Sequence, residues 1–204
     1  MIVSRAEKMK DFYLPPGYRP NPATSVPAKE ERDAYWTSRR IGMATKYQYY
    51  AYRWALAVAK QIGASRILDL GSGPGFKADW FRQKGYDVTL IDQPTVEPVV
   101  RRFFPEARFI GMDISSPHDA LDERFELIVC ADVLEHLERP DKCLHFIRKH
   151  LTNSGFVLLS TPERDIRRGL GCLQSDNLEH IREWNKNEFQ QFVKNEGKKK
   201  KKLR

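Results

Sequence analysis

The sequence predicts an α/β fold, doubly wound around a mainly parallel sheet and preceded by a helical segment. From residue 66 onward, short apolar runs alternate with stretches of helical periodicity, the pattern of a parallel sheet covered by helices on both faces. A glycine-rich turn follows the first apolar run, as expected where a strand leads closely into a helix. The length of 204 residues suits one such domain with a modest extension.

Five apolar runs are expected to form the strands, and four amphipathic stretches the helices between them. The expected strands are Ile67–Leu70, Val88–Asp92, Arg108–Met112, Leu127–Ala131 and Phe156–Ser160. The expected helices are Phe76–Lys84, Val96–Phe104, Cys143–His150 and Lys186–Lys194. Asn185 is expected to cap the last helix, with Glu188 three residues on completing a capping box.

The segment before the sheet divides into an arm and a helix. Five prolines and Gly17 fall within residues 1–30, which predicts an extended arm. From Glu30 to Ile62 the periodicity becomes helical, and Gly63 is expected to end the helix. Its apolar stripe is expected to contain Tyr47, Tyr50, Trp54 and Val58, with Ala51, Ala55 and Ala59 between them. The expected division is an arm with helices (1–62), a core (63–196) and a basic tail (197–204).

Charge and composition favour a cytoplasmic protein without a nucleic-acid partner. Lys198–Lys202 and Arg204 supply six positive charges, and removing these six from the net charge of +8 leaves +2. A terminal lysine run is typical of a solvated tail. No stretch is apolar enough to span a bilayer, and the first residues lack the apolar centre of a secretory signal. The three cysteines (Cys130, Cys143, Cys172) have no metal-like spacing and are expected as free thiols.

The glycine turn is the most specific motif. Residues 67–76 read I-L-D-L-G-S-G-P-G-F, so an apolar strand runs into three glycines: Gly71, Gly73 and Gly75. A dinucleotide fingerprint needs a further glycine at position 76, where this chain has Phe76, which disfavours a nicotinamide-dependent oxidoreductase. The spacing G-x-G-x-G, with Asp69 two residues earlier, resembles motif I of the class I S-adenosylmethionine-dependent methyltransferases, which have a Rossmann-like fold.

The resemblance implies S-adenosylmethionine as the cofactor. The glycine turn would face its methionine part, and Asp69 of the same motif is expected among the cofactor-binding residues. Asp92 ends the second strand, 17 residues beyond Gly75, where a carboxylate can accept hydrogen bonds from both ribose hydroxyls. In the resembling family the residue at Asp113 binds the adenine amino group, and the one at Ile114 packs on the ring. Either aspartate could instead be a cap or turn residue.

The segment after the fourth strand carries the candidate catalytic residues. Val133-Leu-Glu135-His136 resembles the V-L-E-H stretch of the type 11 methyltransferases, which implies that the backbone of Cys130 and Ala131 runs beside the methionine moiety. His136 is the expected general base for a hydroxyl, with Glu135 orienting its ring. A capping or packing role for this histidine is the alternative.

A metal-assisted reaction is a second alternative. Methyltransferases that act on RNA ends or catechol-like quinone precursors are similar here, with E-x-x-E-H and a distant ligand that hold a divalent metal. This chain has Asp132-x-x-Glu135-His136, with His180 further along, and the aspartate is a departure. The expected site contains no metal.

The long segment after the fifth strand is the candidate acceptor site. Its pieces T-P-E-R-D and H-I-R-E-W resemble methyltransferases of bacterial glycan and natural-product clusters. Arg164, His180, Arg182 and Trp184 would suit a hydroxyl-rich acceptor, and a tied-down surface loop is the alternative. We therefore expect O-methylation of a small polar or sugar-like acceptor, such as a glycan. A non-catalytic, truncated cofactor-binding protein is the remaining alternative.

The resemblance covers about residues 45–196 and fails at the end of the chain. Class I enzymes continue with two more strands after the last helix, whereas here Gly197 leads directly into lysines. The last two strands of the family fold are therefore expected to be absent, which leaves Phe156–Ser160 as a sheet edge. This apolar, uncharged strand is expected to be covered by the N-terminal arm, to pair in a homodimer or to aggregate.

Overall fold

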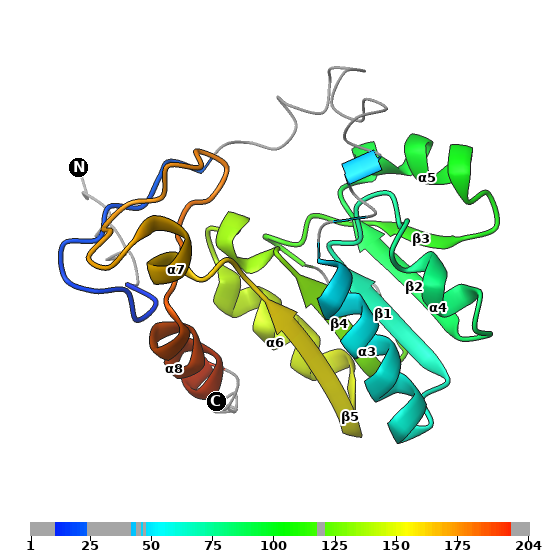
Figure 1. Ribbon diagram of the computed structural model, residues 1–204. Helices are drawn as coiled ribbons and strands as arrows, with labels where there is room; N and C mark the ends of the chain where they lie inside the picture. The colour runs from blue at the N-terminus through cyan, green and yellow to red at the C-terminus, as the bar shows by residue number, and fades with distance from the viewer. Residues whose placement is uncertain (1–10, 24–41, 44–45, 47, 118–120, 197–204) are drawn as a thin grey trace, which may run out of the picture.

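The computed structural model describes residues 11–23, 42–43, 46, 48–117 and 121–196, and its centre is a parallel sheet (Figure 1). The five strands follow the order β3-β2-β1-β4-β5. They are β1 (Arg66–Leu70), β2 (Asp87–Asp92), β3 (Arg108–Gly111), β4 (Phe125–Ala131) and β5 (Leu151–Ser160). The α/β fold and the five expected strands are confirmed. β5 begins earlier than expected, because a register shift lets Leu151 pair with Phe125 before Phe156 pairs with Leu127.

Helices cover both faces of the sheet, and each face has its own hydrophobic layer. One layer contains α3 (Tyr49–Ile62), α4 (Asp79–Arg82) and α5 (Glu97–Phe103). The other contains α6 (Pro140–His150) and α8 (Lys186–Glu196). The short turns η1 (Pro94–Val96) and η2 (Leu134–His136) follow β2 and β4, and α7 (Arg164–Arg168), which the sequence does not predict, follows β5.

The buried face of α3 differs from the expected stripe. Tyr50 and Trp54 are 84% and 72% exposed, whereas Tyr52, Ala55 and Ala59 are buried against the sheet. The expected stripe is therefore wrong at Tyr50 and Trp54, whereas Ala55, Ala59 and the half-buried Val58 face the sheet as expected. Tyr52 is the aromatic residue on the buried face, because its hydroxyl donates to the buried Asp69. Gly63, with φ of 63°, ends the helix as predicted. The expected helical residues 30–41 and Tyr47 lie outside the described residues.

Two helices show how local hydrogen bonds set the boundaries. The expected helix Phe76–Lys84 is α-helical only over Asp79–Arg82, since its flanks are turns in which Trp80 N–H donates to the carbonyl of Lys77 and Lys84 N–H to that of Phe81. The capping box of α8 is confirmed. Glu188 N–H donates to Asn185 Oδ1, and Asn185 N–H donates to Glu188 Oε2, both at 3.0 Å.

The arm over residues 11–23 lies against the segment 171–184, beside α7 (Figure 1). Arg19 N–H donates to the carbonyl of Leu173 at 2.7 Å, and Asn21 N–H to that of Ile181 at 2.9 Å. The rest of the expected arm and the expected basic tail lie outside the described residues. Among the described helices, none is long and apolar enough to cross a membrane.

Candidate functional site

The glycine turn lies between β1 and α4, at the carboxyl edge of the sheet. Gly71 and Gly75 have φ of +79° and +85°, which side-chain-bearing residues rarely adopt. A Cβ at Gly71 would overlap Val133 Cγ2, and one at Gly75 would lie 2.7 Å from Leu90 Cδ1. Glycine is therefore required here by the backbone angles and by the close packing of Val133 and Leu90, at the edge of the sheet where ligands of such folds bind.

Asp69 and Tyr52 form a buried polar pair beneath this turn. The hydroxyl of Tyr52 donates to Asp69 and lies 2.8 and 3.0 Å from its two carboxylate oxygens. Burial raises the pKa of Asp69 to about 7, although the Tyr52 hydroxyl and the charge of Lys77 oppose the shift. Because Asp69 has no exposed surface, it can contribute to the site only indirectly, through its own charge and through the neighbouring residues that it positions.

Lys77 lies beside the glycine turn and was not among the residues predicted from the sequence. It follows the turn by two residues, and its Nζ lies 5.2 Å from the centre of the Tyr52 ring. Burial lowers the pKa of Lys77, whereas the negative charges of Asp69, Asp132 and Asp92 raise it. The signal in the sequence was a charged residue, Lys77, that directly follows the glycine turn and Phe76.

Asp92 reaches from the end of β2 to the glycine turn. Gly73 N–H donates to its Oδ2 at 2.6 Å, and Gln93 N–H donates to its Oδ1 at 2.7 Å. Burial raises the pKa of Asp92, whereas these two hydrogen bonds and the charge of Lys77 lower it. A carboxylate has about four acceptor positions, so two backbone bonds leave capacity for ribose hydroxyls.

Asp113 and Ile114 lie at the end of β3. Asp113 is exposed, and its Oδ1 accepts hydrogen bonds from Ser115 N–H at 2.8 Å, Ser115 Oγ at 2.6 Å and Gln93 Nε2 at 3.3 Å. Asp113 thus forms a local turn, and its adenine contact stays a prediction. Ile114 is buried in the hydrophobic layer of α6 and α8.

Asp132, which follows β4, and Gln48, which precedes α3, both have an unusual backbone conformation. Their φ values are 53° and 59°, in the left-handed region that few non-glycine residues adopt. Gln48 Nε2 donates to the Ala131 carbonyl at 3.1 Å and to Asp132 Oδ2 at 2.9 Å, and Ser160 Oγ donates to Asp132 Oδ1 at 2.8 Å. Such strain is concentrated at functional sites, and here hydrogen bonds from two other segments maintain it.

Cys130 and Ala131 differ in what they offer a ligand. The thiol of Cys130 is fully buried, and a hydrogen bond with Cys143, followed by burial, raises its pKa well above the ordinary value. Only its backbone could therefore meet a cofactor, as expected. The carbonyl of Ala131 is engaged by Gln48. All three cysteines are free.

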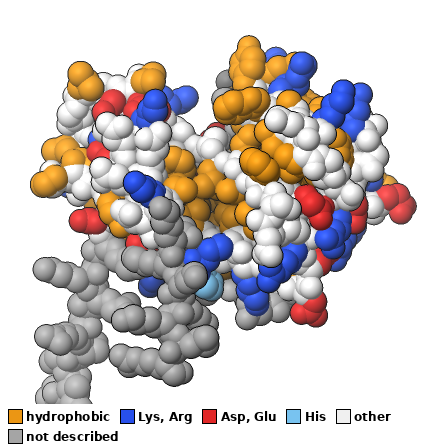
Figure 2. Space-filling model, turned by 90° about the horizontal axis from the view of Figure 1, so that it is seen from below, with side chains coloured by type: hydrophobic (Ala, Val, Ile, Leu, Met, Phe, Trp, Pro, Cys, Tyr) orange, Lys and Arg blue, Asp and Glu red, His pale blue; other side chains and the backbone are white. Residues whose placement is uncertain are grey.

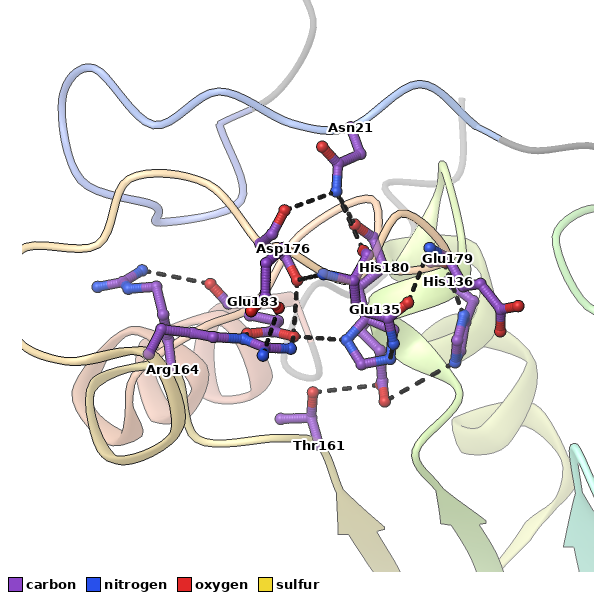
Figure 3. A network of polar contacts seen from close by, with 12 residues as sticks. Asn21, Glu135, His136, Thr161, Arg164, Asp176, Glu179, His180 and Glu183 are labelled. Atoms are coloured by element: carbon purple, nitrogen blue, oxygen red, sulfur yellow. Dashed lines mark hydrogen bonds and ion pairs between the residues drawn. The ribbon is translucent and has the colours of Figure 1, made fainter.

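His136 has a fixed ring orientation. Its Nδ1 lies 2.8 Å from the carbonyl oxygen of Glu179, and donation to a carbonyl requires a proton on Nδ1, so Nε2 is the basic nitrogen of the neutral ring (Figure 3). Glu135 Oε1 is 4.0 Å from Nε2, beyond hydrogen-bond length. The carbonyl of Glu179 therefore orients the ring directly, and a role for Glu135 stays a prediction.

Glu135 is fully buried, and burial, followed by the charge of Asp132, raises its pKa well above the ordinary value. Thr161 Oγ1 donates to its Oε2 at 3.2 Å, and its Oε1 has no hydrogen-bond partner among the described residues. Each of Glu135, His136 and His180 offers one atom that could bind a metal ion, and these three atoms lie within 4.8 Å of one another. The two imidazole rings meet edge to face, with centres 4.7 Å apart.

The predicted acceptor residues belong to a buried network (Figure 3). Arg164 is bonded to both carboxylate oxygens of Glu188, at 2.7 and 2.8 Å. His180 Nδ1 lies 2.6 Å from Glu183 Oε1. Burial alone would raise the pKa of the Glu183 carboxyl group, but hydrogen bonds from His180, Arg168 and Ser175 lower this pKa far below its usual range. The ring of His180 also meets the ring of His136 edge to face.

Arg182 and Trp184 connect the network to the N-terminal arm. Arg182 donates to the carbonyl of Leu137, and its guanidinium lies 4.8 Å from the centre of the Phe12 ring. Trp184 is completely buried, donates from Nε1 to the carbonyl of Phe12 at 2.9 Å and stacks on Phe192. This burial leaves Arg164, Arg182 and Trp184 almost no surface for an acceptor in this structure, and their contact with an acceptor stays a prediction.

Comparison with known proteins agrees with the interpretation of the glycine turn as a methyltransferase motif. A family model described as a methyltransferase domain matches residues 41–199. The ubiquinone biosynthesis O-methyltransferase of Alkalilimnicola ehrlichii is 27% identical over 135 residues, which cover 63% of this chain and 55% of that protein. Its counterpart in Rickettsia conorii is 25% identical over 52% of this chain and 38% of its own length. The chain thus spans about half the length of the curated relatives it matches.

Solved structures share the fold at lower identity. CalS10, an amino pentose methyltransferase from Micromonospora echinaspora with bound S-adenosylmethionine, has a TM-score of 0.53 over 64% of this chain and 58% of that chain, at 18% identity. DesVI of Streptomyces venezuelae has a TM-score of 0.51 over 61% and 56%, at 19% identity. Because the family match extends over residues 41–199, the chain belongs to the class I methyltransferases, whose methyl donor is S-adenosylmethionine.

Proposed function

We propose that this protein transfers a methyl group to a hydroxyl oxygen of a small polar or sugar-like acceptor, such as a glycan. The observation that carries the proposal is the ring of His136, held at Nδ1 by the Glu179 carbonyl with Nε2 as its basic nitrogen. An attacking hydroxyl must lose its proton, so a base suits oxygen methylation. Similar proteins support both the oxygen atom and the sugar-like acceptor: the relative from Alkalilimnicola ehrlichii is an O-methyltransferase, and CalS10 is an amino pentose methyltransferase.

Different residues of the chain would bind the cofactor and remove the proton of the acceptor. Bound S-adenosylmethionine supplies an electrophilic methyl group. Asp92 and the glycine turn would hold its ribose and methionine parts, and Asp113 with Ile114 its adenine. His136 would take the acceptor proton at Nε2. The buried network would fix the segment that carries the Glu179 carbonyl, and precise placement of the reactants supplies much of the rate in such reactions.

The proposal is tested by incubating the protein with S-adenosylmethionine and a panel of sugars that carry only hydroxyls or also an amino group. Mass spectrometry of the products would report the methylated atom. Methylation on oxygen, lost in His136→Ala, is the expected result. Methylation on nitrogen, independent of His136, would replace the oxygen acceptor with an amine while keeping the methyl donor.

A metal-assisted reaction is the second candidate. The observation in its favour is the clustering of Glu135, His136 and His180, together with the buried Oε1 of Glu135, which accepts no hydrogen bond from the part of the chain that the structure describes. One carboxylate and two imidazoles suit a borderline divalent ion. The raised pKa of Glu135 opposes binding, because a ligating carboxylate must lose its proton. Turnover abolished by a chelator and restored by one divalent metal would select this candidate.

We also propose that the protein forms a homodimer through β5. Among the described residues, no strand pairs with the outer edge of β5, which carries no charged residue. Phe156 and Val157 are 52% and 38% exposed. Seen from below, apolar side chains lie in the hollow between the α7–α8 part and the part formed by α3 and β5 (Figure 2). The same edge of a second copy can pair antiparallel across a two-fold axis, which satisfies both edges at once.

A further inference from the structure

Lys77 brings a positive charge into the proposed methionine end of the cofactor site. It leaves the glycine turn two residues after Gly75, and its ammonium group lies over the ring of Tyr52, 5.2 Å from the ring centre. The same Tyr52 donates to Asp69, directly below the turn. Lys77 is half-buried, and its ammonium group therefore lies in a partly enclosed position above the Tyr52 ring.

The carboxylates around Lys77 come from three different strands. Asp69 lies in β1, Asp92 ends β2 and Asp132 follows β4, and each of them interacts electrostatically with the ammonium group. Tyr52 and Gln48 fix two of these acids by hydrogen bonds, and Gly73 fixes the third. The acids are therefore held in the site by hydrogen bonds, and the ammonium group of Lys77 stands beside them on a four-carbon stem that can adopt several rotamers.

This arrangement bears on how the methionine part of the cofactor can be held. That part carries an ammonium group and a carboxylate, and the sulfonium adds a second positive charge. The fixed acids can attract the positive groups, but they repel the carboxylate in a site of low dielectric. A carboxylate placed among three acids needs a cation of its own, and an ammonium group on a flexible stem can reach it.

We propose that Lys77 binds the α-carboxylate of S-adenosylmethionine and thereby distinguishes the intact cofactor from adenosine derivatives that lack this carboxylate. The proposal rests on the methyl donor of the family and is independent of the acceptor. Lys77 acts here as a binding residue, and it exchanges part of its contact with the aspartates for contact with the cofactor carboxylate.

The test is a calorimetric cycle with two ligands and two proteins. The ligands are S-adenosylhomocysteine and its decarboxylated analogue, which keeps the amine and lacks the carboxylate. The wild-type protein should prefer S-adenosylhomocysteine by about 10- to 100-fold, the usual effect of a charge-assisted hydrogen bond. In Lys77→Met this preference should fall to within about threefold, while affinity for the decarboxylated analogue stays near that of the wild type.

Two further variants make each outcome decisive. Lys84→Met removes an exposed lysine at the other end of the same segment and should leave both affinities unchanged. Lys77→Arg keeps the charge and should keep a preference for the carboxylate. An undiminished preference in Lys77→Met, or tighter binding of both ligands by it, would overturn the proposal, because Lys77 would then only neutralise the aspartates. If Lys77→Met binds neither ligand, loss of the preference in Lys77→Arg would overturn it as well.

Discussion

The backbone N–H of Gly73 donates a 2.6 Å hydrogen bond to Oδ2 of Asp92, so one carboxylate both holds the glycine turn and faces the expected ribose position. This couples the end of β2 to the turn after β1. A substitution at Asp92 is therefore expected to act on cofactor binding through two contacts, the ribose hydrogen bonds and the shape of the turn.

Asp92→Ala should weaken binding of S-adenosylhomocysteine by about 10- to 100-fold, because a charged acceptor for the ribose hydroxyls is lost. Isothermal titration calorimetry measures the change. Asp87→Ala, at the exposed start of the same strand, is the matched control and should bind as the wild type does. Equal affinities of the Asp92 and Asp87 variants would remove Asp92 from the cofactor site.

Gly71→Ala should destabilise the fold far more than Gly85→Ala. Both glycines have similar backbone angles, with φ of +79° and +85°, but a Cβ at Gly71 would overlap Val133 whereas one at Gly85 has nothing within 4 Å. Gly85→Ala should cost only the backbone term of about 1 kcal/mol, and Gly71→Ala at least about 2 kcal/mol more from the overlap. Urea denaturation measures both free energies of unfolding. Equal losses would show that Val133 moves away without cost.

His136→Ala should lower turnover on the true acceptor by about a hundredfold or more, while affinity for S-adenosylhomocysteine stays unchanged. The physical reason is the loss of the proton acceptor without loss of any expected cofactor contact. His145→Ala, on the exposed side of α6, is a control with the same residue change. Unchanged turnover in His136→Ala would leave this histidine with a structural role only.

The pH dependence of stability should change in Asp69→Asn. Burial raises the folded-state pKa of Asp69 to about 7, whereas an unfolded aspartate has a pKa of about 4. Between these values the folded state binds more protons than the unfolded state, so this residue makes stability fall as pH rises from about 4 to about 7. Asp69→Asn removes this contribution, and its free energy of unfolding should decrease less over that range. Parallel pH profiles of the two proteins would show that Asp69 is charged throughout.

Local sequence rules predicted the elements whose contacts are local. The capping box of Asn185 and Glu188 involves residues three apart, and it formed as expected. The prediction for α3 was wrong at Tyr50 and Trp54, because periodicity alone cannot tell which of two apolar stripes meets the sheet, and these two residues are exposed while Tyr52 is buried. The network around His180 could not be predicted, since its contact with Asn21 joins residues 159 apart in the sequence.

In the candidate site, too, the contacts between neighbouring segments could be predicted and the contacts between distant segments could not. The contact between the glycine turn and Asp92 could be predicted, because a strand, a turn and the next strand follow one another in the chain. The role of these residues in cofactor binding stays a prediction. The orientation of His136 depends on the carbonyl of Glu179, 43 residues away, and a backbone carbonyl leaves no mark in the sequence. Arg164 and Trp184 were expected at the acceptor because their side chains suit a sugar, but the same side chains also suit a buried ion pair and an aromatic stack.

The last prediction concerns the edge of β5. Val157→Lys places a charge on an exposed position of that edge and should convert a dimer into a monomer, because a lysine on an edge strand opposes pairing with another strand. Ile166→Lys makes the same kind of change at an exposed position on α7, away from the edge, and should leave the dimer intact. Light scattering gives the mass of each protein, and hydrogen exchange along Phe156–Ser160 should be slow in the wild type and fast in Val157→Lys. A wild-type monomer whose β5 amides exchange rapidly would refute the dimer. A dimer that persists in Val157→Lys and dissociates in Ile166→Lys would move the interface to α7.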